Sequence, residues 1–352
     1  MTLPKSKTTI SDVAKTAGVS NSAVSYALNG KPGVSEDTRA KVLDVAERLG
    51  WRPNSAAKAL SDAKTHNVGL VLTYDTGVLS VESYTMELIA GLTAELETEG
   101  YSLLLRSSPS HVEERSILKE WIAAGAVDAV LIMNVELGDS RIDLFKEKPT
   151  VPALALCDAS MAGGLPALAD DEGGAAHLIV DYLHELGHEY IARIAGPEML
   201  EHTFIRDNAF VDEAAELGLR YSCFHTDYSP QGGERCTRRL LSLPDRPTAI
   251  VYDNDVMALS SLQTIGKMGF RVPDDLSVVS WNDSFMCEVS RPTITALNRD
   301  VVRRGSKAAT MLLSLIDGRQ VESVQQEDNE LIFRQSSGPL GVHPRRGQGH
   351  ME

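Results

Sequence analysis

The apolar positions of residues 8–61 repeat with the spacing of short α-helices. This pattern predicts three helices, over residues 9–18, 21–28 and 36–49. Thr9 and Asp12 have the spacing of a capping box, and Gly18 supplies a stop for the first helix. Because only a short turn separates the first two helices, the segment fits a helix-turn-helix unit supported by a third helix. The same spacing also fits an ordinary three-helix lobe.

A fourth helical segment over 53–60 is too short to be stable alone. Pro53 and Asn54 form a plausible helix start, but fewer than two turns follow. Nucleation costs more free energy than so few hydrogen bonds return. We therefore expect this segment to form against a partner. DNA is the obvious candidate, which favours the helix-turn-helix interpretation.

From Asn67 onward, short apolar strands alternate with amphipathic helices. Strands are predicted at 68–73, 102–106, 129–133, 153–156, 191–196, 221–225, 249–252 and 277–281. Helices are predicted at 84–99, 112–124, 174–186, 204–217, 231–242 and 255–268. Two successive strand–helix series imply two parallel-sheet lobes. The break between them is expected around 165–171, and 295–300 has the pattern of a return crossing.

This pattern predicts an all-α headpiece with a hinge helix, followed by a two-lobed α/β domain. The expected boundaries are 1–65 for the headpiece and hinge, 66–340 for the α/β domain, and 341–352 for a disordered tail.

Charge is divided unevenly between these parts. The 352-residue chain has a net charge of −15, yet residues 1–64 hold ten Lys or Arg against six Asp or Glu. The acidic remainder would repel phosphate and confine DNA contact to the basic end. The chain has no apolar stretch of 18 residues and no signal-peptide pattern, so we expect a cytoplasmic protein. Its four scattered cysteines are expected to be reduced.

The headpiece sequence resembles the lactose/galactose repressor family of bacterial transcriptional regulators. The resemblance rests on the runs Ile10-Ser11-Asp12-Val13-Ala14, Ala17-Gly18-Val19-Ser20, Val24-Ser25, Leu28-Asn29, Val34-Ser35, Thr38-Arg39 and Arg52-Pro53-Asn54, and continues to about Ser337. It implies major-groove contacts from Ser20, Asn21, Ser22, Ser25, Tyr26 and Asn29. It implies phosphate contacts from Thr9, Ser35 and Thr38, and minor-groove contacts from Asn54, Ala57 and Leu60. Many relatives carry arginine at the position of Tyr26, so the base preference there is expected to differ.

For the larger domain, the resemblance implies the periplasmic-binding-protein architecture, with a small ligand between lobes joined by three crossings. It implies a first lobe of about 66–169 and 300–318, and a second of about 170–298 and 319–340. Open carboxyl ends of parallel strands are where such ligands bind. The candidate effector residues are Tyr74, Asp75, Tyr84, Thr85, Arg206, Asn254, Asn282, Asp283 and Arg299. These side chains suit a polyhydroxylated ligand such as a sugar. Each isolated Asn or Asp fits a loop or helix cap equally well.

Two segments depart from the family pattern. Ser280-Trp281-Asn282-Asp283 stands where most relatives have Gly-(Phe/Tyr)-Asp-Asp, so Asn282 removes a charge that often holds sugar hydroxyls. The segment Asp170-Asp171-Glu172-Gly173-Gly174 aligns ambiguously, and we assign it no ligand contact.

One motif indicates a different class of protein. His184-Glu185-Leu186-Gly187-His188 matches the H-E-x-x-H of zinc metalloproteases, in which both imidazoles share one helical face. Gly187 falls where the helix should end, so the two histidines are expected to diverge. The sequence also has no Walker loop, no Gly-x-Gly-x-x-Gly and no nucleophile elbow, so we expect no metal, no cofactor and no enzyme activity.

We accordingly expect a homodimeric repressor of a pseudopalindromic operator, controlled by a small effector, most readily a carbohydrate, with no membrane contact. A purine- or nucleoside-responsive repressor is the alternative within this class. A sugar-binding transport component is the rival from another class, but it needs a signal peptide and no headpiece. The effector, its action as inducer or corepressor, and the choice of dimer or tetramer stay open.

Overall fold

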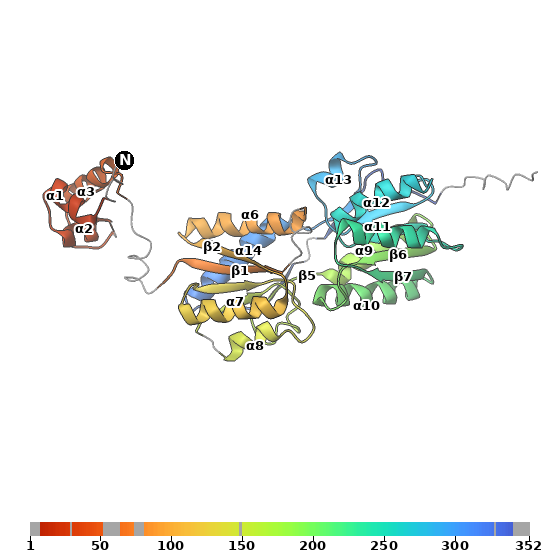
Figure 1. Ribbon diagram of the computed structural model, residues 1–352, viewed down its shortest axis with the longest axis horizontal. Coiled ribbons are helices and arrows are strands. Elements are labelled where there is room, and N and C mark those ends of the chain that lie inside the picture. The colour runs from red at the N-terminus through yellow and green to blue at the C-terminus, as the bar shows by residue number, and fades with distance from the viewer. Residues whose placement is uncertain are drawn as a thin grey trace, which may run out of the picture. The chain divides into compact units, whose positions relative to one another are not determined.

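A bundle of three short helices forms the headpiece of this computed structural model, which describes residues 8–28, 30–51, 64–73, 81–147, 150–326 and 329–340. The chain divides into two compact units, Met1–Thr65 and His66–Glu352. The headpiece helices are α1 (Ile10–Ala17), α2 (Asn21–Leu28) and α3 (Glu36–Arg48) (Figure 1). The predicted helices 9–18, 21–28 and 36–49 are confirmed to within one residue at each end. The predicted hinge helix over 53–60 lies outside the described residues.

The headpiece core forms because each helix turns one small apolar face inward. Its buried side chains are Val13, Ala14, Ala17, Val24, Ala27, Val42, Val45 and Ala46. The capping box at the start of α1 is present, with Thr9 and Asp12 satisfying each other's backbone N–H groups. Gly18 ends α1 in the left-handed conformation, at φ 68°, where a side chain would be strained.

The first lobe of the larger unit is a parallel four-stranded sheet in the order β2-β1-β3-β4. Its strands are β1 (Asn67–Thr73), β2 (Ser102–Ser108), β3 (Ala129–Ile132) and β4 (Ala153–Ala155). Its helices are α6 (Ser83–Thr98), α7 (His111–Ala124), α8 (Ser140–Glu147) and α14 (Val301–Ile316). Apolar residues of α6 and α14 pack on one face of the sheet, and those of α7 and α8 on the other.

Helices α6 and α14 approach each other closely because two glycines face across the contact. A Cβ atom at Gly91 would collide with the carbonyl of Val302, and one at Gly305 with the carbonyl of Leu88. The hydroxyl of Ser306 donates a hydrogen bond to the carbonyl of Gly91 at 3.2 Å. This pairing fastens a late segment of the chain to the first lobe.

The second lobe is a six-stranded sheet in the order β12-β10-β9-β8-β6-β7, parallel except for β12. Its strands are β6 (Tyr190–Ala195), β7 (Arg220–His225), β8 (Ala249–Tyr252), β9 (Ser277–Ser280), β10 (Thr295–Asn298) and β12 (Glu330–Ile332). Its helices are α9 (Glu172–Glu185), α10 (Glu201–Glu216), α11 (Pro230–Leu241), α12 (Asp255–Lys267) and α13 (Phe285–Val289). α9 and α10 cover one face, and α11 and α12 the other.

Three crossings join the lobes. β5 (Leu168–Asp170) lies on the first and pairs in parallel with β11 (Val324–Gln326) on the third. The second runs from β10 through Arg299 into α14.

All eight predicted strands and six predicted α/β-domain helices are present, with ends shifted by at most three residues. Not predicted were α8, α13, α14, β5, β10, β11 and β12. Among the described helices, none is both long and apolar enough to span a bilayer.

Candidate functional site

The exposed face of α2 is the first candidate site. Val24 and Ala27 fix the orientation of this helix by packing inward, which leaves Ser22 and Tyr26 in solvent. The Tyr26 side chain is 45% exposed, so an aromatic ring with a polar tip stands on the surface without a core role. The amide of Asn21 donates to the hydroxyl of Ser11 on α1, which holds it at the start of the helix.

Hydroxyl groups mark the starts of all three headpiece helices. Thr9 caps α1, Ser20 accepts a hydrogen bond from the N–H of Ala23 at the start of α2, and Ser35 caps α3. Helix starts present N–H groups and the positive end of the helix dipole, which favours phosphate. Ser35 also shares a hydrogen bond with Thr38, at 2.9 Å between their hydroxyl oxygens.

The structure thus places most of the predicted DNA-contacting residues on this small unit. Thr9, Ser20, Asn21, Ser22, Tyr26 and Ser35 are exposed, and Ser25 and Thr38 are half-buried. The predicted contacts Asn29, Asn54, Ala57 and Leu60 lie outside the described residues.

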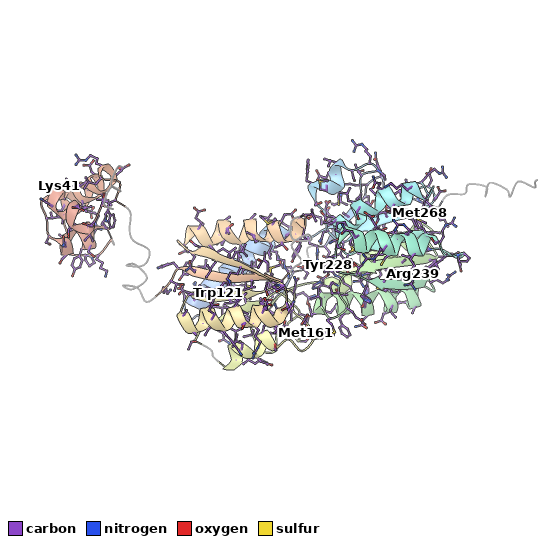
Figure 2. The ribbon with its side chains drawn as sticks, in the orientation of Figure 1. Lys41, Trp121, Met161, Tyr228, Arg239 and Met268 are labelled. Atoms are coloured by element: carbon purple, nitrogen blue, oxygen red, sulfur yellow. The ribbon has the colours of Figure 1, made fainter. Side chains whose placement is uncertain are left out.

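The second candidate site is a pocket between the two lobes, with an empty volume of about 730 Å³ that includes the solvent at its mouth. It lies at the carboxyl ends of parallel strands, as expected for this topology. Tyr228, labelled in Figure 2, follows β7 and lines the pocket where the lobes meet. The lining residues are Glu82, Tyr84, Met133, Asn134, Leu156, Cys157, Asp158, Asp170, Glu172, Glu201, His202, Arg206, Tyr228, Asp253, Asn254, Asn282, Arg299 and Arg304.

Glu172 holds the centre of this pocket by pairing with two arginines. It begins α9 and accepts hydrogen bonds from Nε and Nη2 of Arg206, at 2.7 and 2.9 Å. Arg299, on the second crossing, donates to the same carboxylate at 3.1 Å and to the side-chain oxygen of Asn282 at 2.7 Å. The guanidinium of Arg206 stacks on the ring of Trp281, 4.2 Å from its centre. These contacts fix both arginines before any ligand arrives.

A second buried carboxylate, that of Asp253, extends the network of ion pairs around Glu172 and Arg206 to Arg193. Asp253, which follows β8, accepts hydrogen bonds from Nε and Nη2 of Arg193 at 2.6 and 2.7 Å. It also lies 3.4 Å from Nη1 of Arg206. Arg193 is fully buried in the middle of β6 and needs these partners, because an unpaired buried charge is costly.

The electrostatics of the pocket set different protonation states for its acids and its histidine. Burial alone would raise the pKa of Glu172, but Arg206 and Arg299 hold it well below its usual range. Burial raises the pKa of the Glu201 carboxyl to about 7. Burial, together with the charge of Arg206, lowers the pKa of His202 to about 3, so this imidazole is neutral at pH 7. The pocket therefore offers fixed donors, fixed acceptors and one carboxyl that can take either role.

Of the predicted effector residues, five line the pocket: Tyr84, Arg206, Asn254, Asn282 and Arg299. Asn254 also caps α12 by accepting from the N–H of Met257, so the alternative role of a helix cap holds as well. Tyr74 and Asp75 lie outside the described residues.

Two predicted residues do not belong to the lining. Thr85 is fully buried at the start of α6, where its N–H donates to the carboxylate of Glu82. Asp283 forms a two-point ion pair with Arg334, with both distances at 2.8 Å. Both residues follow a lining residue in sequence, Tyr84 and Asn282, but their own side chains are not among those that line the pocket.

Several lining residues were not predicted, and only some carried a signal. An arginine amid the apolar strand Tyr190–Ala195 indicates a buried ion pair, so a buried acid such as the lining residue Asp253, the partner of Arg193, could have been expected. Glu172 was left unassigned because its segment aligns ambiguously. Glu201, His202 and Tyr228 carry no distinguishing pattern, since only the tertiary fold brings them to one pocket.

The metalloprotease interpretation of residues 184–188 is contradicted by the local geometry. α9 ends at Glu185 and Gly187 adopts a φ of 84°, so His184 and His188 do not share a helical face. His188 turns inward, and its two ring nitrogens are hydrogen-bonded to Thr248 and Ser277 at 2.9 and 3.0 Å. This imidazole packs as a core residue.

Two parts of the chain, one in the headpiece and one in the larger unit, match models of known protein families. Residues 9–54 match the family described as bacterial regulatory proteins, lacI family, and residues 180–337 match the periplasmic binding protein-like domain. The transcriptional regulator AglR of Rhizobium meliloti is 31% identical over 94% of both chains. The transcriptional repressor PurR of Mannheimia succiniciproducens is 29% identical over 93% of this chain and 98% of its own. These relatives are transcriptional regulators and not enzymes.

Solved structures of transcriptional regulators have a similar fold. A LacI family regulator from Bifidobacterium animalis subsp. lactis is 49% identical, with a TM-score of 0.73 over 79% of this chain and all of its own. The lac repressor dimer bound to operator and an anti-inducer is 25% identical, with a TM-score of 0.83 over 94% of this chain and 99% of its own. The regulator CelR in complex with cellobiose is 28% identical, with a TM-score of 0.70 over 94% of this chain and all of its own.

The headpiece and the two-lobed α/β unit are therefore the parts that the sequence resemblance implied. The protein belongs to the lacI family of bacterial transcriptional regulators, with a helix-turn-helix DNA-binding domain followed by a periplasmic-binding-protein-like domain.

Proposed function

We propose that the protein is a dimeric repressor whose affinity for a pseudopalindromic operator is controlled by a small polyhydroxylated ligand in the pocket between the lobes. The observation that carries this proposal is that one pocket takes side chains from both lobes. Tyr84 and Asp158 come from the first lobe, and Arg206 and Asn254 come from the second. A ligand touching all of them favours one arrangement of the lobes, and that differential affinity is what shifts a conformational equilibrium.

The DNA-binding half of the proposal assigns α2 to the major groove. Its exposed Ser22 and Tyr26 supply hydroxyl groups for base edges, while the starts of α1 and α3 supply N–H groups for phosphates. We assign Leu60 to the minor groove, where an apolar wedge opens a flexible base step at the operator centre. The similarity to the operator-bound lac repressor dimer supports two headpieces acting on two half-sites.

The lining favours a neutral, hydroxyl-rich ligand. A sugar hydroxyl both donates and accepts, so it can bridge an arginine and a carboxylate that stand side by side, such as Arg206 and Glu172. The rings of Tyr84 and Tyr228 offer surfaces for an apolar sugar face. The similarity to CelR, solved with cellobiose, supports the same class of ligand.

Charge argues against a phosphorylated ligand. The lining holds six carboxyl groups and three arginines, and each arginine is already paired with an acid. A phosphate would meet an excess of negative charge and would have to displace a buried ion pair. A purine or nucleoside without phosphate is the second candidate, supported by the similarity to the repressors named PurR and by the two tyrosine rings.

A thermal-shift screen against sugars, polyols, nucleobases and nucleosides tests the ligand class. A ligand present at 100 times its Kd stabilises the folded protein by about 2.7 kcal/mol, which is easily detected. We expect stabilisation by a carbohydrate. Stabilisation by a nucleobase or nucleoside alone would establish the second candidate, and stabilisation only by sugar phosphates would overturn the charge argument.

A further inference from the structure

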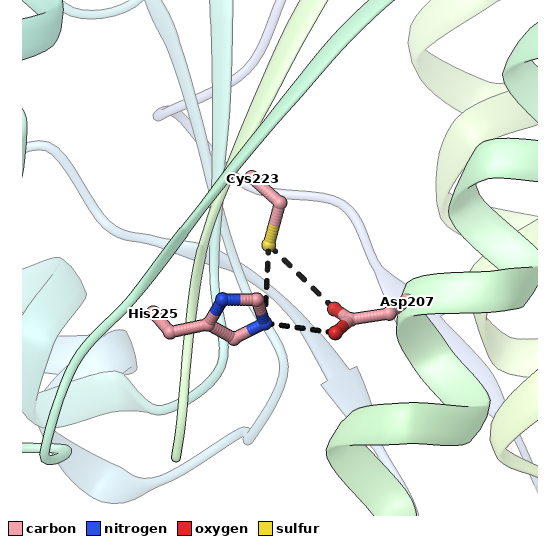
Figure 3. Close-up of side chains that lie close together, drawn as sticks. All are labelled: Asp207, Cys223 and His225. Atoms are coloured by element: carbon pink, nitrogen blue, oxygen red, sulfur yellow. Dashed lines mark hydrogen bonds and ion pairs between the residues drawn. The ribbon is translucent and has the colours of Figure 1, made fainter. Parts of the chain in front are cut away.

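Outside the pocket, Asp207, Cys223 and His225 bring three metal-binding atom types together on the second lobe (Figure 3). Cys223 and His225 lie two residues apart on β7, so both point to the same face of this edge strand. Asp207 reaches them from α10, which covers that face. Nε2 of His225 lies 2.8 Å from Oδ2 of Asp207, and Sγ of Cys223 lies 3.6 Å from Oδ1 of Asp207 and 3.8 Å from Nε2 of His225.

We propose that Asp207, Cys223 and His225 form a binding site for one divalent transition metal ion, of which Zn²⁺ is the best match. A thiolate, an imidazole and a carboxylate are ligands that suit Zn²⁺, and the sulfur disfavours Mg²⁺ and Ca²⁺. Metal–ligand bonds of about 2.0–2.3 Å place the ligand atoms of a tetrahedral site about 3.3–3.5 Å apart. The 3.8 Å between Sγ of Cys223 and Nε2 of His225 lies near this range, and Sγ reaches the Asp207 carboxylate at Oδ1, 3.6 Å away. The hydrogen-bonded pair of His225 Nε2 and Asp207 Oδ2, now 2.8 Å apart, has to open by about 0.5 Å.

The hydrogen-bond pattern argues against a nucleophilic role for Cys223. A catalytic cysteine, histidine and aspartate use the two ring nitrogens separately, one for the thiol and one for the carboxylate. Here Cys223 and Asp207 both contact Nε2 of His225, as Figure 3 shows. Three side chains converging on one point fit a shared ion better than a proton relay.

Arg193 balances the charge of the site without occupying it. Its Nη1 donates to Oδ1 of Asp207 at 2.5 Å, which leaves Oδ2 for the metal. Burial raises the pKa of the Cys223 thiol to about 12, so the metal-free thiol is protonated at pH 7. Binding would release that proton to solvent as the sulfur–metal bond forms. The charges of thiolate, carboxylate, guanidinium and metal then sum to a single positive charge. His225 is exposed, so ion and water can reach the fourth position.

The test is a Co²⁺ titration of the full-length, reduced, chelator-treated protein, because cobalt bound to a thiolate shows a charge-transfer absorption. We expect one equivalent to bind with this absorption and Zn²⁺ to displace it. Cys223→Ser should lose the absorption. His225→Gln, which alters an exposed side chain, should weaken binding by at least about 100-fold, since even a supporting residue around a metal is worth 10–100-fold.

Cys236→Ser is the matched control, because Cys236 is a half-buried thiol on α11 outside the cluster. It should bind cobalt as the unmodified protein does. Thermal unfolding of each metal-free variant verifies that the fold is kept. The proposal is overturned if the unmodified protein shows no thiolate absorption, or if Cys223→Ser and His225→Gln bind cobalt as tightly as the control.

Discussion

Arg206 and Glu172 form a two-point ion pair at the centre of the pocket, with Nε to Oε2 at 2.7 Å and Nη2 to Oε1 at 2.9 Å. The ring of Trp281 lies against the guanidinium, and Arg299 holds the same carboxylate from the second crossing. The donor and acceptor that a ligand meets are thus already in place. Such preorganisation lowers the entropic cost of binding.

Replacing Arg206 with Lys should weaken ligand binding and leave operator binding intact. Lysine keeps the charge but cannot form the two-point pair with Glu172. We expect a loss of about 1.5–3 kcal/mol in ligand affinity, the value of a hydrogen bond to a charged group. Calorimetry with the ligand from the screen measures the loss. Arg334→Lys is the control, because it breaks an equivalent pair with Asp283 outside the pocket. Equal losses in both variants would remove Arg206 from the site.

Glu201 should make the stability of the folded protein fall as pH rises from about 4.5 to about 7. Burial raises the pKa of this carboxyl to about 7, from an ordinary value of 4.5. In that window the folded state keeps a proton that the unfolded state has lost, so raising the pH favours unfolding. Glu201→Gln removes this contribution.

We therefore expect the Gln variant to gain stability relative to the unmodified protein across that window, by on the order of 3 kcal/mol. Urea unfolding at several pH values measures the difference. Glu216→Gln, an exposed change on the same helix, should show no such trend. Parallel stability curves for the Glu201 variant and the unmodified protein would contradict the assignment.

Replacing Tyr26 with Arg should change the preferred base at one position of each half-site. Arginine can contact guanine through two hydrogen bonds, and such a contact is worth about 1–3 kcal/mol of discrimination. Binding-site selection from a random DNA pool gives the comparison. Leu43→Arg adds the same charge at a similarly exposed position on α3 and should strengthen binding without altering the selected sequence. An unchanged motif for the Tyr26 variant would show that α2 does not read the bases in this register.

Replacing Gly305 with Ala should destabilise the first lobe. The new methyl group would collide with the backbone of α6 at Leu88, and overpacking of this kind costs about 1–3 kcal/mol. Gly266→Ala on α12 has open space around it and should instead stabilise its helix, by about 0.5–1 kcal/mol. Chemical unfolding of both variants checks this pair. Equal effects would mean that the contact between α6 and α14 is looser than described.

The headpiece was predictable because its helices are local structures. Thr9, Asp12 and Gly18 mark one helix with caps that depend only on neighbours in sequence. α14 was not predicted, although its apolar residues have helical spacing, and it carries Gly305 near its start. This glycine is explained only by the close approach of α6 at Leu88, a residue separated from Gly305 by more than half the length of the sequence.

The candidate site was only partly predictable for a related reason. Arg206 could be aligned to a family pattern and Arg299 could be placed on the returning segment, but their shared partner Glu172 stands in a segment that aligns ambiguously. Which carboxylate faces which guanidinium depends on where β5 and β10 cross between the lobes. The sequence shows that acids and arginines are present, and only the fold pairs them.

Coupling between the pocket and the operator is the central claim, and one titration tests it most directly. Fluorescence anisotropy measures operator affinity of the unmodified protein with and without a saturating amount of the ligand from the screen. Coupling of the usual size, about 1–3 kcal/mol, predicts a change in operator affinity of roughly 5–150-fold, in either direction. Arg206→Lys should reduce that change at the same ligand concentration. A ligand that binds the pocket and leaves operator affinity unchanged would contradict the claim.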